Sequence, residues 1–186
     1  LVYWFARRLT GDATLALVAG LLFAVHPVHV EAVANIVGRA EVLVCVWLLA
    51  GMLLLMPHAG RPGLGRTALA ALCCLLALLS KESAICYPVV AVLVLGWTSG
   101  VRVREWRWWT PRLVLLALPL AVYFPMRYVA LDGHLWRAVP QGLVINPLAH
   151  VGGFDRVVGV FMVLGHYARL LFLPAQLIGA RLVHAF

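Results

Sequence analysis

Long apolar runs, separated by short polar segments, set the pattern of this chain. Runs without Asp, Glu, Lys or Arg cover residues 13–30, 42–60, 67–80, 83–101 and 113–126, and a weaker run at 157–180 is interrupted by Arg169. An α-helix needs roughly 20 residues to cross about 30 Å of hydrocarbon, so two of the runs are long enough and three are short. With residues 1–6 as the end of a further helix, the pattern predicts an all-α, polytopic transmembrane bundle of about six spanning helices.

Composition supports a membrane protein. The chain is 64% hydrophobic and 12% charged, and its mean hydropathy is +0.98, values outside the usual range of soluble globular domains. A short apolar run alone also fits a soluble core helix, but a soluble domain would not alternate such runs with so few polar residues. We therefore expect an integral, multi-pass protein in contact with the lipid bilayer.

The charged residues predict the orientation. With helices at 13–25, 42–56, 67–80, 84–97 and 113–126, one side carries eight arginines and two acidic residues, and the other carries five basic and five acidic residues. The positive-inside rule places the arginine-rich side in the cytoplasm. The formal charge of +8 is thus mostly cytoplasmic anchoring, and we expect no nucleic-acid partner. The segment VRVREWRWW at 101–109 would also suit a single strand of nucleic acid, but interfacial Trp and Arg anchors explain it better.

The densest group of polar residues is HPVHVEAVANIVGRAE at 26–41, on the predicted exoplasmic side. From Pro27 onward its apolar residues fall on one helical face, which predicts an amphipathic helix along the membrane interface. His26, His29 and Glu31 have side chains that bind divalent metals, but no HExxH motif is present, and closely spaced histidines more often form hydrogen bonds at a helix end. We predict no metal site here.

Three short helices end in polar residues on the same side. The first ends at His26, the second at Lys81 and Glu82, and the third at Arg127. Polar groups at membrane depth are tolerated where they face a cavity or each other. This favours a recessed exoplasmic cavity that His29 and Glu31 also line, with helix tilt and snorkelling of the long side chains as the alternative.

These residues carry a resemblance to a known family. HPVHVEAVANIVGRAE resembles the HPxHxEAVxxxxGRA(D/E) signature of the transmembrane and tetratricopeptide-repeat-containing (TMTC) family and its bacterial relatives. The later segments LLSKES, MRYVAL and INPLAHV are similar to family segments in the same order. The resemblance extends over essentially the whole chain.

The resemblance implies a GT-C-type glycosyltransferase that takes a sugar from a polyprenyl-phosphate donor and transfers it to a protein hydroxyl. The eukaryotic members are O-mannosyltransferases that act on cadherin-type domains in the ER lumen. The residues implied to line or support the site are His26, His29, Glu31, Gly38, Arg39, Glu41, Lys81, Glu82, Arg127 and Asn146.

Transfer from a polyprenyl phosphate needs positive charge for the leaving phosphate and a carboxylate for the acceptor hydroxyl. We assign Lys81 and Arg127 to the phosphate, and Glu31 and Glu82 to catalysis, through positioning of the acceptor or a metal. His26, His29, Arg39 and Asn146 complete the expected substrate-binding set, and we expect Arg39 and Glu41 to fix the helix by local pairing. A divalent ion such as Mg²⁺ or Mn²⁺ stays open as a cofactor.

Two features depart from the family pattern. GT-C enzymes are expected to use an acidic residue of the first exoplasmic loop, which would precede Leu1, and no 34-residue repeat of paired helices is present. We therefore expect residues 1–186 to be one partial GT-C-like transmembrane domain of the bacterial inner membrane or the ER membrane. The competing classes are a transporter, for which Pro88, Pro119 and Pro125 would break helices, and a non-catalytic scaffold or lipid-binding protein.

Overall fold

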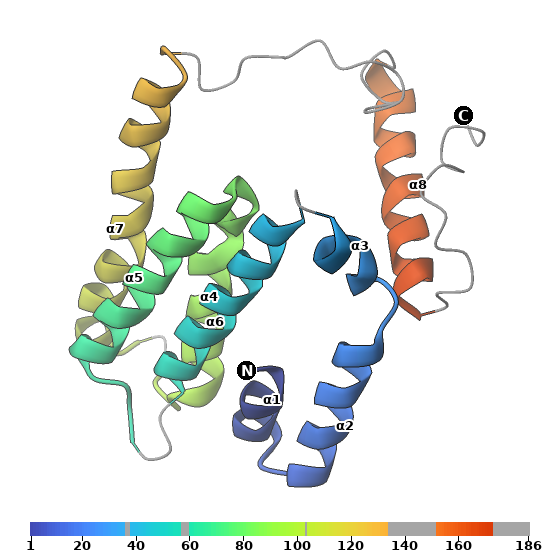
Figure 1. Cartoon of the computed structure of the whole chain (residues 1–186). Helices are drawn as coiled ribbons and strands as arrows, with labels where there is room; N and C mark the ends of the chain where they lie inside the picture. The colour runs from blue at the N-terminus through green and yellow to red at the C-terminus, as the bar shows by residue number, and fades with distance from the viewer. Residues whose placement is uncertain (36–37, 57–59, 103, 134–151, 173–186) are drawn as a thin grey trace. The chain divides into compact units, whose positions relative to one another are not determined.

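A computed structural model describes residues 1–35, 38–56, 60–102, 104–133 and 152–172, apart from the side chains of Val30, Glu31 and Phe172 (Figure 1). The regular elements in these ranges are helices, and no strand is found among them, so the predicted all-α class is confirmed. The chain forms two compact units, residues 1–26 with 31–135 and residues 27–30 with 136–186.

The first unit begins with two short helices, α1 (Val2–Thr10) and α2 (Ala13–Val25), which pack against each other. Gly11 ends α1 in the left-handed conformation, with φ of 75°. The Asp12 carboxylate then accepts hydrogen bonds from the backbone N–H groups of Thr14 (2.6 Å) and Leu15 (3.1 Å). This is an N-cap, and it explains why α2 begins at the predicted residue.

The polar segment contains the short helix α3 (His29–Ala34) and the start of α4 (Arg39–Leu55). A helix thus forms within the segment where the sequence predicted one, but it is only six residues long, and its amphipathic, interfacial character stays a prediction. A Cβ at Gly38 would lie 2.6 Å from Ala32 Cα and 2.8 Å from Ala32 C. The glycine of the motif is thus required because the chain returns onto its own backbone before α4.

The next elements are α5 (Leu64–Ser80), the 3₁₀ turn η1 (Glu82–Cys86), α6 (Tyr87–Thr98) and α7 (Trp106–Ala130). Helix α5 packs against both α4 and α7. Arg66, at the start of α5, contacts the end of α4, whereas Lys81, after the end of α5, contacts the start of α4. Helices α4 and α5 are therefore antiparallel (Figure 1).

Helix α7 corrects the expected span of 113–126, because it has 25 residues and extends across Arg112 and Arg127. It is the one described helix that is long and apolar enough to cross a membrane. Pro111, Pro119 and Pro125 all lie inside it, and Pro88 lies in the first turn of α6. Of the three prolines that a transporter would use to break helices, Pro119 and Pro125 thus lie within a continuous helix and Pro88 lies at the start of one.

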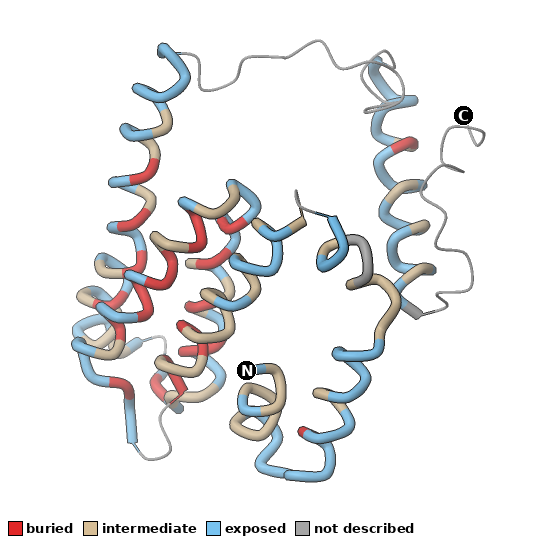
Figure 2. The backbone as a smooth tube through the Cα atoms, in the orientation of Figure 1, coloured by how far each residue is buried: buried red, intermediate tan, exposed pale blue. Residues whose placement is uncertain are grey.

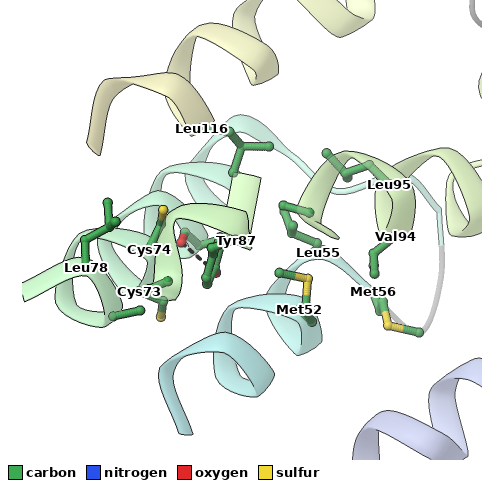
Figure 3. Close-up of a cluster of buried hydrophobic side chains, with 14 of the residues drawn as sticks. Met52, Leu55, Met56, Cys73, Cys74, Leu78, Tyr87, Val94, Leu95 and Leu116 are labelled. Atoms are coloured by element: carbon green, nitrogen blue, oxygen red, sulfur yellow. Dashed lines mark hydrogen bonds between the residues drawn. The ribbon is translucent and has the colours of Figure 1, made fainter. Parts of the chain in front are cut away.

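The centre of the first unit is a cluster of buried side chains from α4 to α7 (Figure 3). Tyr87 of α6 is fully buried, and its hydroxyl donates a 2.8 Å hydrogen bond to Ala70 O of α5. The Tyr87 side chain lies against α4 at Gly51, where an added Cβ would overlap the Tyr87 hydroxyl. The buried face of α5 is made mainly of small residues, namely Thr67, Ala70, Ala71, Cys73, Cys74 and Ala77. Small residues allow helix backbones to approach closely, as in membrane helix pairs.

Much of the described chain is exposed (Figure 2), and the exposed residues include many large apolar ones. Leu22 is 61% exposed on α2, Leu93 is 67% exposed on α6, and Val114 is 62% exposed on α7. In α2 the only residue buried is Ala16. The first unit therefore has a buried apolar core and, in addition, many large apolar side chains on its surface. Apolar exposure on this scale needs a covering partner or lipid.

In the second unit the described helix is α8 (Gly153–Phe172), which corresponds to the weaker apolar run predicted at 157–180. His166 is half-buried and Arg169 is exposed in the last turn. Residues 173–180 of the predicted run lie outside the described ranges.

Candidate functional site

The first unit separates its charged contacts to the two ends of its helices. The ion-pair end consists of Glu41, Lys81, Glu82 and Arg127, and the arginine end consists of Arg8, Arg61, Arg66, Glu105 and Arg112. The first set comes from the start of α4, the α5–η1 junction and the last turn of α7. The second set joins the other ends of these helices. The residues that meet at each end are thus ones that the sequence assigned to the same side of the chain.

At the ion-pair end, Lys81 Nζ pairs with Glu41 Oε1. Lys81 follows α5 in extended conformation, and its backbone N–H bonds to Ala77 O, which fixes where the side chain leaves the helix. Glu41 lies in the first turn of α4, where a carboxylate also complements the helix dipole. The expected local pairing of Glu41 with Arg39 is replaced by this contact across 40 positions of sequence.

The second pair joins η1 to α7. Arg127 Nη1 lies 3.5 Å from Glu82 Oε2 and donates a 2.8 Å hydrogen bond to the Tyr123 hydroxyl one turn earlier. The Arg127 Cζ is 5.9 Å from the centre of the Tyr123 ring, which is itself buried. The Glu82 side chain is 67% exposed, so its attraction to Arg127 is weakened by solvent. Tyr123 is therefore the firmer partner of Arg127.

Because Lys81 and Glu82 are adjacent, the two ion pairs form one chain of alternating charge, Glu41–Lys81–Glu82–Arg127, across α4, the α5–η1 junction and α7. The structure thus brings together Lys81, Glu82 and Arg127 from the predicted set. Each predicted phosphate ligand already has a carboxylate partner, so an anion bound there must compete with Glu41 and Glu82.

The other predicted site residues are placed as follows. His26 is the C-cap residue of α2 and His29 is the first residue of α3, and both are half-buried. Arg39 is exposed at the start of α4. Glu31 lies in α3, but its side chain is outside the described part of the structure, as is the whole of Asn146.

A metal centre has no support from the part of the chain that is described. Among those residues no three His, Cys, Asp or Glu side chains are grouped as metal ligands would be. The Glu31 side chain lies outside the described part of the structure, so the grouping of His26, His29 and Glu31 is left open.

At the arginine end, guanidinium groups bind the last carbonyls of α4. Arg8 Nη1 donates to Leu53 O (3.2 Å) and to Met56 O, and Arg66 Nε donates to Leu54 O (2.7 Å). The final carbonyls of a helix have no partner within the helix and carry partial negative charge. These arginines are therefore structural caps, which differs from a purely external anchoring role.

Arg112 and Arg61 fasten α7 to the segment before α5. The Arg112 side chain is buried, donates to Pro62 O (2.9 Å) and Trp108 O (2.7 Å), and stacks 3.9 Å from the Trp108 ring centre. Arg61 pairs with Glu105 at 2.9 Å on the surface. The hydrogen bond from Arg61, with a second from the backbone of Arg102, holds the pKa of the Glu105 carboxyl below its usual range.

Sequence reasoning missed Tyr123 and the true partner of Lys81. The spacing of Tyr123 and Arg127, one turn apart on a helix, was a usable signal for the first contact. Nothing in the local sequence selects Glu41 over the adjacent Glu82 as the partner of Lys81, because that choice depends on the antiparallel packing of α4 and α5.

Comparison with known proteins identifies the class of relatives as protein O-mannosyl-transferases. The chain is 36% identical over 142 residues to protein O-mannosyl-transferase Tmtc2 of Drosophila melanogaster, a match that covers 70% of this chain and 14% of the relative. It is 45% identical over 85 residues to Tmtc1 of the same organism, covering 46% of this chain and 10% of the relative. Against mouse TMTC1 it is 53% identical over 53 residues, covering 28% of this chain and 6% of the relative.

These relatives confirm the resemblance to the TMTC family that the motifs predicted. The matched segments span only about one-tenth of the relatives' length. No protein-family model matches the chain, and no solved structure matches it significantly.

Proposed function

We propose that this chain is part of a membrane glycosyltransferase of the TMTC type, which transfers a sugar from a polyprenyl-phosphate donor to a protein hydroxyl on the exoplasmic side. The similarity to named protein O-mannosyl-transferases carries the proposal. Mannose is the sugar that their names indicate. The charge chain at the ion-pair end supplies groups of the type that this reaction needs.

The proposed topology is a GT-C-like bundle of about six spanning helices in the bacterial inner membrane or the ER membrane. The outward apolar side chains of α2, α6 and α7 support contact with lipid. The separation of the ion-pair end from the arginine end supports a cytoplasmic position for the latter and an exoplasmic position for the former.

The transfer step places most of its new charge on phosphate oxygen. The acceptor oxygen bonds to the anomeric carbon, the bond from that carbon to the phosphate oxygen breaks, and the polyprenyl phosphate leaves with the electron pair. The acceptor proton passes to a carboxylate, for which Glu31 and Glu82 are our candidates. Positive groups near the phosphate stabilise this charge more in the transition state than in the bound donor.

Lys81 and Arg127 are the proposed phosphate ligands. In the structure their charges are balanced by Glu41 and Glu82, and the Arg127–Glu82 contact is long and exposed. Binding of the donor phosphate to Arg127 would release Glu82 toward the acceptor, while Tyr123 keeps the guanidinium in place. His26, His29, Arg39 and Asn146 are proposed to bind or orient the two substrates.

The test is transfer by the full-length protein in lipid nanodiscs, with radiolabelled polyprenyl-phosphate mannose and a cadherin-type acceptor domain. We expect Lys81→Ala and Arg127→Ala each to lower the rate of transfer on the order of 100-fold, as loss of a group that stabilises developing charge does. Arg61→Ala is the matched control, since Arg61 is also an exposed cation in an ion pair, but at the arginine end.

Transfer near the wild-type rate in both variants, with unchanged donor affinity, would remove the phosphate role of Lys81 and Arg127. Donor binding without any transfer by the wild-type protein would favour the lipid-binding alternative.

A further inference from the structure

Arg102 and residues 104–109 make contacts that the proposed transfer reaction does not use. Glu105 organises them: its side chain accepts from the backbone N–H of Arg102 (3.2 Å), and its carbonyl accepts from Trp108 N (2.9 Å). Trp109 Nε1 then donates to Arg102 O (3.2 Å). Glu105 and Trp109 therefore connect Arg102 to the start of α7.

The arginine and tryptophan side chains of residues 104–109 divide into two groups. Trp108 and Trp109 are half-buried, lie edge to face at 5.1 Å, and face the helix bundle through Arg112 and the core. Arg104, Trp106 and Arg107 are exposed, with Trp106 at 66%. Arg107 lies 5.7 Å from the centre of the Trp106 ring, and within the described ranges neither it nor Arg104 is in an ion pair. Two arginines that are in no ion pair within the described ranges and one aromatic ring are thus exposed close together in the sequence.

Their position suits a bilayer surface. Trp106 is the first residue of α7, the one described helix that is long and apolar enough to span a membrane, and Arg104 and Arg107 lie on either side of it in the sequence. Exposed Trp97 lies at the end of α6, the helix that precedes α7 in the chain. Tryptophan and arginine side chains at the end of a spanning helix lie at headgroup depth.

We propose that Arg104, Trp106 and Arg107 form a binding site for the phosphate-bearing headgroups of anionic lipids. This rests on the membrane placement in the proposed function, but not on its chemistry. The guanidinium groups complement the charge of the phosphate, the Trp106 ring lies at the depth of the headgroups, and Glu105 is kept from opposing them by its contact with Arg61.

A single strand of nucleic acid fits this surface less well. Such strands bind through successive aromatic rings on which neighbouring bases stack. Here the Trp108 face is occupied by Arg112, and Trp109 is held through its ring nitrogen. Within the segment, Trp106 alone remains exposed for stacking.

The test measures quenching of tryptophan fluorescence by brominated phosphatidylglycerol, titrated into phosphatidylcholine nanodiscs that hold the full-length protein. A Trp106→Phe variant gives the signal of the remaining tryptophans for subtraction. Since one arginine near a membrane surface changes affinity about fivefold, we expect R104Q/R107Q to weaken the preference for phosphatidylglycerol about 25-fold. The matched control is R156Q/R169Q, which removes the same charge from exposed positions of α8.

The proposal is overturned if the wild-type protein does not prefer phosphatidylglycerol, if both double variants lose the preference equally, or if soluble glycerophosphoglycerol competes as well as the lipid. Displacement of the lipid by a single-stranded RNA of 20 nucleotides would assign the surface to nucleic acid instead. Loss of sugar transfer with an intact lipid preference would count against the proposed function alone.

Discussion

A single methyl group at Gly51 is expected to destabilise the contact of three helices. In G51A the new Cβ would overlap the Tyr87 hydroxyl and lie 2.8 Å from Cζ of that ring and 3.2 Å from Cys73 Cβ. Tyr87 is fully buried and bonded to Ala70 O, so the ring can move only by breaking that hydrogen bond or displacing α4.

The magnitude follows from three terms. Overpacking of a core costs about 1–3 kcal/mol, and loss of the Tyr87 hydrogen bond costs about 1 kcal/mol. Replacing glycine by alanine inside a helix returns about 1 kcal/mol. We expect a net loss of roughly 1–3 kcal/mol, which lowers the melting temperature by about 2–4 °C for each kcal/mol in a protein of this size.

The buried thiols of Cys73 and Cys74 provide the assay, because they become reactive toward a fluorogenic maleimide only when this core opens. A background with Cys86→Ser removes the signal of an exposed thiol. Gly96→Ala is the matched control within α6, since its Cβ would meet nothing closer than 3.9 Å, and it should be neutral or stabilising.

The hydroxyl should account for part of the effect. Y87F alone is expected to cost about 1 kcal/mol, and because it removes the atom that the new methyl overlaps, G51A/Y87F should cost less than the sum of the single changes by about 1 kcal/mol. A melting temperature for G51A equal to that of Gly96→Ala, or strict additivity in the double variant, would refute the assignment.

Two further predictions concern the ends of the helices. Gly38→Ala should destabilise the α3–α4 turn more than Gly65→Ala does, because the Cβ added at residue 38 would meet backbone atoms of Ala32, whereas a Cβ at residue 65 would meet nothing within 4 Å. The measure is limited proteolysis, which should cut the 30–40 region faster in Gly38→Ala. Equal rates of cleavage in the two variants would contradict the prediction. Since the pKa of Glu105 is lowered in the folded protein, its contact with Arg61 stabilises the fold above the ordinary glutamate pKa and is lost as pH falls through the lowered value. The backbone amides of residues 99–102 and 104–106 should therefore be better protected from hydrogen exchange at pH 7 than at pH 3. The variant E105Q should abolish this difference, and a difference that persists in E105Q would contradict the contact.

The helices of the first unit were largely predictable, and the exceptions have physical causes. Helix α2 follows the predicted 13–25 because Asp12 caps its first turn and the chain becomes extended at His26, directly before Pro27, although the apolar run continues to residue 30. Helix α7 was underestimated because charged residues were used as boundaries. Arg112, however, bonds to Trp108 O one turn earlier, so the helix continues past the charge.

The candidate site was predictable in its residue types but not in its pairings. Lys81, Glu82 and Arg127 do meet at one end of the helices, as their positions at predicted helix ends implied. The pairing of Lys81 with Glu41 depends on the packing of α4 against α5, whereas the contact of Tyr123 with Arg127 could have been inferred from their spacing of one helical turn. The catalytic and binding roles of all these residues remain predictions, and the Glu31 side chain and Asn146 also lie outside the described ranges.

The adjacency of Lys81 and Glu82 has a mechanical consequence. One residue holds α4 and the next holds α7, so the two long helices are linked through a single peptide unit about 3.8 Å long. Sliding of α7 along α4 by more than a few ångströms must break one pair or rotate that peptide. The α5–η1 junction therefore couples the two helices, because a movement of α4 that displaces Lys81 also displaces Glu82, the carboxylate partner of Arg127 on α7.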